Sequence, residues 1–297
     1  EPPPFVYREG VTSEKAVAAD KNVNIKLCVF EGRLKINGWD HDEVRIFVKN
    51  GSRFGVKVLA KDPTSMKPVW LLIIGDAKTR IPGQSAECIS GETVEMDVPM
   101  GASLSISGQS TQTSVDSVKK IEFKNVAGSI ALRNITGGIV ASTYQGDVTV
   151  ENSGGAISLE SQTGNIVAYE VSPGQIGDLF KVKTSRGAIS LQKLEHRQIE
   201  ANSISGTLLF NGKFLSGGQY NFKTQNGSIR LMLPIDSSCT VQATYGYGSF
   251  NSELPLIKLT ENVTPALKTI VAKIGSGEAC NVNLITSTGT IGIKKQQ

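Results

Sequence analysis

A unit of three residues recurs along the C-terminal two-thirds of this chain: a glycine, any residue, and a branched or aromatic apolar residue. Another apolar residue usually stands two positions further on, which is the alternation of a strand with one buried and one exposed face. The first five units start nine residues apart, so two of them make a coil of 18 residues, and the later gaps are 23, 19, 21, 21 and 41 residues. The units begin at Gly128, Gly137, Gly146, Gly155, Gly164, Gly187, Gly206, Gly227, Gly248 and Gly289.

The constant phase of this unit distinguishes parallel stacking from a series of hairpins. Hairpins would place Asn-Gly or Asp-Gly turns between strands, whereas here glycine opens nearly every strand, at a tight corner that a Cβ would obstruct. We therefore predict an all-β fold, a parallel β-helix or β-solenoid, with right-handed crossovers as the commoner hand. The residues two positions after the glycines should be buried: Ile130, Val148, Ile157, Ile189, Leu208, Ile229 and Ile291.

The regularity of the pattern divides the chain into three parts. Residues 1–20 are expected to be an N-terminal extension whose best helix candidate, residues 13–19, is too short to matter. Residues 21–108 hold strand candidates of uneven length among Pro63, Pro68 and Pro82. We expect an irregular β-rich region that caps the solenoid, as a separate domain or as its first coils. Residues 109–297 form the repeat region, and residues 254–277, which contain Pro255 and Pro265, should leave the coil as an irregular excursion.

Charge and hydropathy argue against two kinds of partner. The 31 basic and 27 acidic residues are spread evenly, without the basic stripe that nucleic-acid binding requires. The longest apolar run, residues 69–74, is far shorter than the ~20 residues that span a bilayer, so no transmembrane segment is expected in this chain. A first residue of Glu1 rather than Met is typical of a mature chain from which a signal peptide or a membrane-anchored segment has been removed.

The four cysteines, Cys28, Cys88, Cys239 and Cys280, are widely spaced, and no Cys-x-x-Cys motif occurs. An even number favours disulfides and an oxidising compartment over a zinc site. Cys239 and Cys280 each lie nine residues before a repeat glycine, Gly248 and Gly289. If residues 254–277 are an excursion, the two strands become neighbours about 4.8 Å apart, within reach of a disulfide. Their Cβ atoms would point the same way, so a strained or reduced pair stays possible.

Candidate catalytic and metal-binding residues are few. The run Asp40-His41-Asp42-Glu43 has ligands that suit a divalent cation, but consecutive residues of an extended segment point to opposite faces, which favours a solvated turn. His196 stands in a polar stretch between two strands, which predicts a surface loop. No Gly-x-Ser-x-Gly motif occurs. We therefore expect no catalytic residue, no metal and no cofactor, and the pattern indicates no particular ligand-binding residues.

Four segments carry a resemblance to a known family: residues 38–46, residues 94–102 preceded by Cys88, residues 226–234 and residues 246–250. Together with the repeats, they resemble a bacterial adhesin-type family of domains of unknown function, over roughly residues 20–293. The resemblance implies a β-helical bacterial protein that is secreted, periplasmic or exposed at the cell surface. It supplies no catalytic residues. It is also the main support for a disulfide between Cys28 and Cys88.

The function expected from these features is that of a non-enzymatic, extracytoplasmic, adhesin-like binding or scaffold protein of the bacterial cell envelope. Its ligand could be carbohydrate, a cell-envelope polymer or protein, bound to a hydroxyl-rich face that we expect Arg133, Thr149, Ser158 and Ser190 to share. Two alternatives remain: a β-helical polysaccharide lyase or hydrolase, and the ectodomain of an envelope-stress sensor. A lyase site would need Asp, Arg and Lys clustered on adjacent coils.

Overall fold

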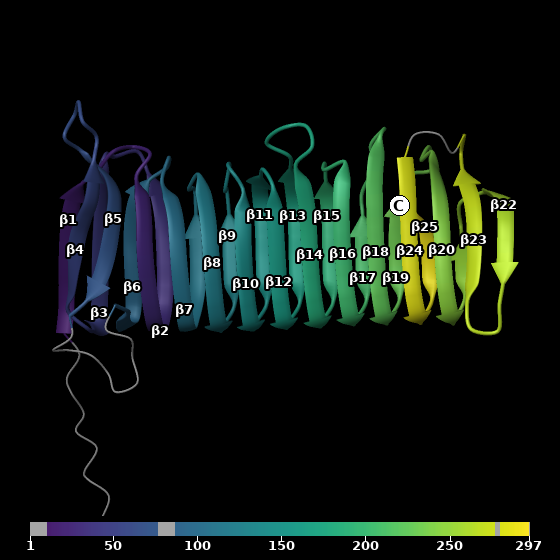
Figure 1. Ribbon diagram of the computed structural model, residues 1–297, viewed down its shortest axis with the longest axis horizontal. Coiled ribbons are helices and arrows are strands. Elements are labelled where there is room, and N and C mark those ends of the chain that lie inside the picture. Colours follow the sequence, from purple (N-terminus) through teal and green to yellow (C-terminus); the bar gives the residue numbers. More distant parts are fainter. Residues whose placement is uncertain (1–10, 77–86, 277–279, 297) are drawn as a thin grey trace, which may run out of the picture. The chain divides into compact units, whose positions relative to one another are not determined.

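The computed structural model of the chain describes residues 11–76, 87–276 and 280–296 (Figure 1). These residues form strands and turns and no helix, so the predicted all-β class is confirmed. Nothing in this part of the chain is a helix of the length and hydropathy needed to cross a membrane. Pro82, Gly277 and residues 1–10 of the expected extension lie outside the described residues. The chain forms two compact units, Glu1–Gly128 and Ser129–Gln297.

The first unit is organised around its longest strand, β2. The strands are β1 (Val11–Ala18), β2 (Asn24–Trp39), β3 (Glu43–Gly51), β4 (Phe54–Lys61), β5 (Pro68–Gly75), β6 (Ile89–Pro99), β7 (Ser103–Asp116) and β8 (Lys120–Ala127). The two halves of β2 pair in parallel with β5 and β6, and β7 pairs in parallel along nearly its whole length. β3 is antiparallel to both β1 and β6, and β4 is antiparallel to β5.

Residues 13–19, the best helix candidate, lie almost entirely in the strand β1. The backbone of β1 pairs with β3 from Val11 to Ala18. A helix of so few residues is marginal in water, and the ladder with β3 satisfies the same backbone groups. Part of the expected N-terminal extension is therefore built into the first unit.

β2 turns from one ladder to the other at Gly32. This glycine has a φ of +117°, and a Cβ there would overlap the carbonyl oxygen of Gly91 in β6. Close by, Cys28 of β2 forms a disulfide with Cys88, which precedes β6, with Cα atoms 4.4 Å apart. The cross-link ties β2 to the start of β6 next to the bend.

The second unit has two strands per coil. They are β9 (Ile130–Arg133), β10 (Ile139–Gln145), β11 (Val148–Gly154), β12 (Ile157–Thr163), β13 (Ile166–Ser172), β14 (Leu179–Arg186), β15 (Ile189–Leu194), β16 (Gln198–Ser205), β17 (Leu208–Asn211), β18 (Gly218–Asn226), β19 (Ile229–Leu233), β20 (Cys239–Tyr247), β21 (Phe250–Ser252), β22 (Leu256–Val263), β23 (Lys268–Ile274), β24 (Cys280–Thr288) and β25 (Ile291–Lys295).

Strands of successive coils pair in parallel and in register, as a β-solenoid requires. One ladder runs β9, β11, β13, β15, β17, β19, β25, β21, and the other runs β10, β12, β14, β16, β18, β24, β20. The seven residues predicted to be buried are at most 2% exposed, so this prediction is confirmed. Ile139 and Ile157 belong to the second ladder, so alternate units of the nine-residue repeat lie in different ladders.

One corner of each coil carries the glycines of the first ladder. At Gly187, with a φ of +153°, a Cβ would overlap the carbonyl oxygen of Gly164 in the neighbouring coil. The same approach recurs at Gly164, Gly206, Gly227, Gly289 and Gly248. A buried hydroxyl three residues before the glycine donates to the carbonyl of the adjacent glycine, as from Thr184 to Gly164 at 3.0 Å. Ser161, Ser203, Thr224 and Thr286 do the same.

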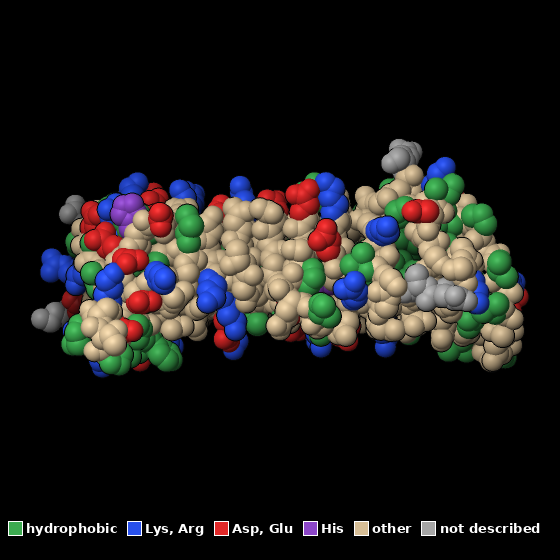
Figure 2. All heavy atoms as spheres, turned by 90° about the horizontal axis from the view of Figure 1, so that it is seen from above, with side chains coloured by type: hydrophobic (Ala, Val, Ile, Leu, Met, Phe, Trp, Pro, Cys, Tyr) green, Lys and Arg blue, Asp and Glu red, His purple; other side chains and the backbone are tan. Residues whose placement is uncertain are grey.

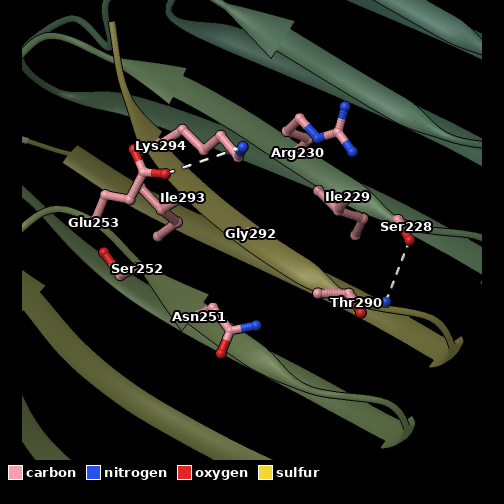
Figure 3. Close-up of a pocket in the computed structure, with 10 residues that line it drawn as sticks. All are labelled: Ser228, Ile229, Arg230, Asn251, Ser252, Glu253, Thr290, Gly292, Ile293 and Lys294. Atoms are coloured by element: carbon pink, nitrogen blue, oxygen red, sulfur yellow. Dashed lines mark hydrogen bonds and ion pairs between the residues drawn. The ribbon is translucent and has the colours of Figure 1, made fainter.

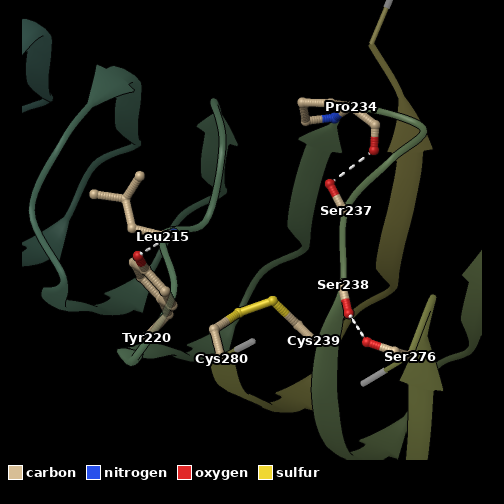
Figure 4. Close-up of a disulfide and its surroundings, with 8 residues drawn as sticks. All are labelled: Leu215, Tyr220, Pro234, Ser237, Ser238, Cys239, Ser276 and Cys280. Carbon is tan, nitrogen blue, oxygen red and sulfur yellow. Dashed lines mark hydrogen bonds between the residues drawn. A yellow bond between two sulfur atoms is a disulfide. The ribbon is translucent and has the colours of Figure 1, made fainter. Parts of the chain in front are cut away.

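The last coil is out of sequence order. β24 pairs in parallel with both β18 and β20, and β25 pairs with both β19 and β21, so the C-terminal coil lies between two coils formed by earlier residues (Figure 1). Residues 254–277 were expected to be irregular, but β22 and β23 form an antiparallel hairpin that extends the ladder beyond β20. A disulfide joins Cys239 of β20 to Cys280 of β24, with Cα atoms 4.6 Å apart (Figure 4).

His196 does not lie in a surface loop, as its polar neighbours suggested. The side chain is fully buried, its Nε2 lies 2.9 Å from the carbonyl oxygen of Gly155, and its ring meets Phe180 edge-on. The segment between β13 and β14 lies outside the strands, with Ile176 highly exposed, so the corner there lacks a regular coil. We interpret the imidazole as filling the interior beside that loop.

Candidate functional site

A hollow lies on the outer side of the ladder β19-β25-β21, at the place where the last coil is inserted. The outward side chains of these strands form a grid, because parallel strands in register place equivalent residues side by side. At the centre, Gly292 lies between Arg230 of β19 and Asn251 of β21. Since Gly292 has no side chain, one position of the grid is vacant.

We call this hollow the Gly292 notch (Figure 3). It encloses about 230 Å³. A Cβ built on Gly292 would meet no atom within 4 Å, so neither packing nor backbone geometry requires glycine here. The lining residues are Ser228, Ile229, Arg230, Asn251, Ser252, Glu253, Thr290, Gly292, Ile293 and Lys294.

The polar groups on one side of the notch hold each other in place. The hydroxyl of Ser228 accepts a hydrogen bond from the backbone nitrogen of Thr290 at 3.3 Å (Figure 3). The side-chain amide of Asn251 donates to the hydroxyl of Ser249 at 3.2 Å, and that hydroxyl lies 3.5 Å from the Thr290 hydroxyl. These groups can offer hydrogen bonds to a ligand from positions fixed by the strands.

The charged groups of the notch are unequally paired. Lys294 and Glu253 form an ion pair at 4.0 Å, and the carboxylate of Glu253 also accepts a hydrogen bond from the backbone nitrogen of Lys295 at 3.2 Å. Arg230 has no ion pair within 4.0 Å in the described part of the chain (Figure 3). The notch therefore carries one uncompensated positive charge.

Two other cations on the outer side of the same ladder, Arg133 and Lys193, are paired. Arg133 lies 3.6 Å from Glu151. Lys193 donates to the carboxylate of Glu170 at 2.8 Å and to the hydroxyl of Tyr169 at 2.7 Å, and the pKa of Glu170 is lowered chiefly by the hydrogen bond from Lys193. Arg230 differs from both because its neighbours in adjacent strands, Leu209 and Gly292, carry no charge.

A second hollow, of about 450 Å³, lies on the other ladder of the second unit. Its rim includes Lys183, Asn202, Lys223 and the exposed side chain of Ile204. Lys183 is paired with Glu160 at 3.1 Å. Figure 2 shows a face on which basic and acidic side chains are interspersed, with no extended patch of one sign.

The residues expected to form one hydroxyl-rich face do not share a face. Thr149 and Ser190 lie in the same outward row of the first ladder, with Val167 between them, whereas Ser158 belongs to β12 in the second ladder. Arg133 is paired with Glu151. The expectation is wrong because units nine residues apart alternate between two ladders, so they do not share one face.

The acidic run of the first unit is divided among separate contacts. Asp42 forms an ion pair with Lys67 at 2.6 Å, which lowers the pKa of the Asp42 carboxyl mainly through that hydrogen bond. His41 stacks on Trp39, whose indole nitrogen donates to the backbone oxygen of Glu43. Among the described residues, no group of three or more His, Cys, Asp and Glu side chains gathers closely enough to hold a metal ion.

The sequence contains one signal for the notch. In the unit that begins at Gly289, the outward position between Ile291 and Ile293 is a glycine, whereas the unit that begins at Gly227 has Arg230 there. The neighbour across Gly292 could not be found in this way, because Asn251 becomes adjacent only through the insertion of the last coil.

Comparison with known proteins identifies a family. A family model described as Toastrack DUF4097 matches residues 20–294. No curated protein matches the chain. A solved structure described as "a putative cell adhesion protein from Clostridium sporogenes ATCC 15579" is 12% identical, with 96% of this chain and 100% of that chain covered and a TM-score of 0.31. A likeness at that score supports no conclusion about fold or function.

Proposed function

This chain belongs to the Toastrack family of β-solenoid domains of unknown function, and from that premise we propose that it is a non-enzymatic binding or scaffold protein of the bacterial cell envelope. The observation that carries the proposal is the Gly292 notch. Polar groups of three adjacent strands converge there around a position that lacks a side chain. Small-molecule and sugar sites commonly have this form, a concave surface with a few fixed polar groups.

The framework around the notch supports a binding role. Beneath it, Ile229, Ile291 and Ile293 are at most 1% exposed, so the floor is part of the packed interior. Parallel strands on either side restrict the backbone of β25. A site on such strands loses little conformational entropy when it binds, which favours recognition of a repeating polymer through many weak contacts.

Two disulfides support the extracytoplasmic part of the proposal. Cys28–Cys88 and Cys239–Cys280 account for all four cysteines of the chain. Structural disulfides persist in oxidising compartments such as the periplasm and the cell surface, and are rare in the cytosol. Labelling of free thiols in intact bacteria should find none on this protein, and a reduced pool in the native host would contradict this location.

Binding of purified protein to immobilised envelope polymers tests the proposed function. The panel should contain neutral polysaccharides, polyuronates, teichoic acids and peptidoglycan fragments. We expect saturable binding to at least one class, weakened by Gly292→Val, which fills the notch. Absence of binding to every polymer would contradict the binding role. Protein-dependent cleavage of a polysaccharide would favour the lyase or hydrolase alternative instead.

A further inference from the structure

The guanidinium of Arg230 is the group in the Gly292 notch that is best placed to choose a ligand. It has an uncharged residue on either side, and no described acidic group pairs with it. A guanidinium presents a planar fork of N–H donors that matches the two oxygens of a carboxylate or of a phosphodiester. Such an arginine, beside an open space rather than beside a glutamate, is suited to an external anion.

The charge of the notch sets the charge of its ligand. Lys294 and Glu253 largely neutralise each other, which leaves the single charge of Arg230. A singly charged oxyanion would complete the balance, whereas a dianion such as a phosphate monoester would leave excess negative charge beside Glu253. The notch therefore favours a carboxylate or phosphodiester over a neutral sugar or a phosphate monoester.

The other polar groups around the notch suit the polymer to which such an anion would be attached. The Thr290 hydroxyl lies two residues before Gly292 along the chain, and the Asn251 amide lies on the side of Gly292 away from β19. Both groups can donate and accept hydrogen bonds. The vacant position above Gly292 gives a ligand access to Arg230 and to these groups together. A polyhydroxylated backbone next to the anion would satisfy them.

We propose that the Gly292 notch binds a singly charged oxyanion, a carboxylate or a phosphodiester, carried on an acidic hydroxyl-bearing polymer. This inference rests on the proposed binding function and names the ligand class of the same site. Arg230 would pair with the anion, and Thr290 and Asn251 would bind adjacent hydroxyls.

The test compares four probes by isothermal titration calorimetry with the full chain. They are an oligogalacturonate, its methyl ester, a glycerol-phosphate oligomer and a neutral manno-oligosaccharide. Arg230→Gln removes the charge, and Gly292→Val fills the notch at a strand position with open space. Arg133→Gln is the matched control, because it removes an arginine from the outer side of the same ladder in another coil.

We expect one or both anionic probes to bind. Arg230→Gln should weaken that binding at least about tenfold, as loss of a charge-assisted hydrogen bond predicts. Gly292→Val should weaken it to a similar degree, because the valine side chain occupies the vacant position. Arg133→Gln should change it less than about twofold, and the methyl ester should bind no better than the neutral probe. Tighter binding of the oligogalacturonate would show that the notch prefers a carboxylate, and tighter binding of the glycerol-phosphate oligomer would show that it prefers a phosphodiester.

Two results would overturn the inference and leave the proposed function intact: anionic probes that bind equally to wild type and Arg230→Gln, or binding of the neutral probe alone. Failure of all four probes, together with failure of the whole envelope-polymer panel, would overturn both. Circular dichroism and thermal unfolding of each variant establish that lost binding does not reflect lost folding.

Discussion

The hydroxyl of Thr224 donates a hydrogen bond, 3.1 Å long, to the carbonyl oxygen of Gly206 in the adjacent coil. Thr224 is 1% exposed, so its hydroxyl is shielded from water. Each such bond joins one coil to the next at the glycine corner, beside the backbone ladder. The row of hydroxyls is therefore part of what holds the stack of coils together.

Replacing Thr224 with valine removes this hydrogen bond and preserves the shape of the side chain. We expect the free energy of unfolding to fall by about 1–2 kcal/mol, because the Gly206 oxygen loses its hydrogen-bond partner in the adjacent coil. Urea denaturation measures the change. Thr149→Val, on the outer side of the other ladder, should alter stability by less than about 0.5 kcal/mol. Equal effects at the two positions would show that the buried bond has no special role.

Glycines of the second unit differ in whether they can be replaced by alanine, and a comparison of Gly187 with Gly292 tests this difference. At Gly187 an added Cβ overlaps the carbonyl oxygen of Gly164, and the backbone has a positive φ. Gly187→Ala should destabilise the protein by on the order of 3 kcal/mol, since strain and a backbone shift combine. Gly292→Ala should be neutral or slightly stabilising, because alanine restricts the unfolded chain more than glycine does. Thermal unfolding of both variants decides, and a neutral Gly187→Ala would be inconsistent with the close approach of the coils.

Burial of His196 predicts a pH dependence of stability. Desolvation lowers the pKa of the imidazole in the folded chain, against smaller opposing effects from the Gly155 carbonyl and from Asp178 and Glu195. In the unfolded chain histidine titrates near pH ~6.5. As the pH falls below that value the unfolded state takes up a proton that the folded state resists, so stability present at neutral pH is lost, at up to about 1.4 kcal/mol per pH unit.

The measurement is the free energy of unfolding between pH ~5 and ~7, where His196→Gln should have a shallower slope than wild type. His41, the other histidine of the chain, is exposed, so His41→Gln serves as the control and should keep the wild-type slope. Identical slopes for wild type and His196→Gln would mean that the imidazole is not buried in its neutral form.

The disulfide between Cys239 and Cys280 closes a loop of 41 residues that contains the hairpin β22–β23. Its removal in a Cys239→Ser/Cys280→Ser variant should cost about 4 kcal/mol, through the added freedom of the unfolded chain. Chemical denaturation measures the loss. In wild type, thiol counting under denaturing, non-reducing conditions should find no reactive thiol. Two thiols per chain would rule out one of the bridges, and peptide mapping would identify which.

The outer strand of that hairpin, β22, has two features that discourage pairing with another molecule. Leu259 forms a bulge, and the ion-paired Lys258 and Glu261 stand opposite the buried residues Ala272 and Ile270 of β23. Bulges and inward charges are known protections of edge strands. Lys258→Val/Glu261→Val should therefore self-associate, as seen by light scattering over a concentration series. Thr260→Val/Asn262→Val, on the opposite side of β22, should stay closer to wild type. The reverse order would contradict a protective role for the ion pair.

The spacing between each repeat glycine and the apolar residues after it was sufficient to predict which side chains are buried in the second unit. Ile189 and Ile229 follow their glycines by two residues, and that spacing fixes the side of the strand on which they lie. The neighbouring positions of Cys239 and Cys280 also followed from phase, because each precedes a repeat glycine by the same interval. Both inferences needed only distances along the sequence.

Contacts between coils could not be predicted in the same way. The ladder to which Ile157 belongs depends on how many strands and corners each coil has. A spacing of nine residues is compatible with one strand per coil or with two, so it does not decide in which ladder Ile157 lies. His196 is buried because the neighbouring coil is interrupted by a loop, which its polar sequence neighbours do not reveal. The Gly292 notch depends on β21, β25 and β19 being adjacent, and that order differs from the order of the sequence.

The insertion of β24 and β25 between coils formed by earlier residues also affects how the chain can fold. Synthesis proceeds from the N-terminus, so β18 and β20 emerge before the strand that separates them. Both carry the same inward pattern, with Tyr220 and Phe222 in β18 and Val241 and Ala243 in β20, so local sequence does not prevent their direct pairing. If coils were added strictly in the order of synthesis, β20 would pair directly with β18 and occupy the position that β24 has in the structure. The native arrangement is therefore decided by the residues that arrive last, and a nascent chain that ends before Cys280 lacks the information to complete it.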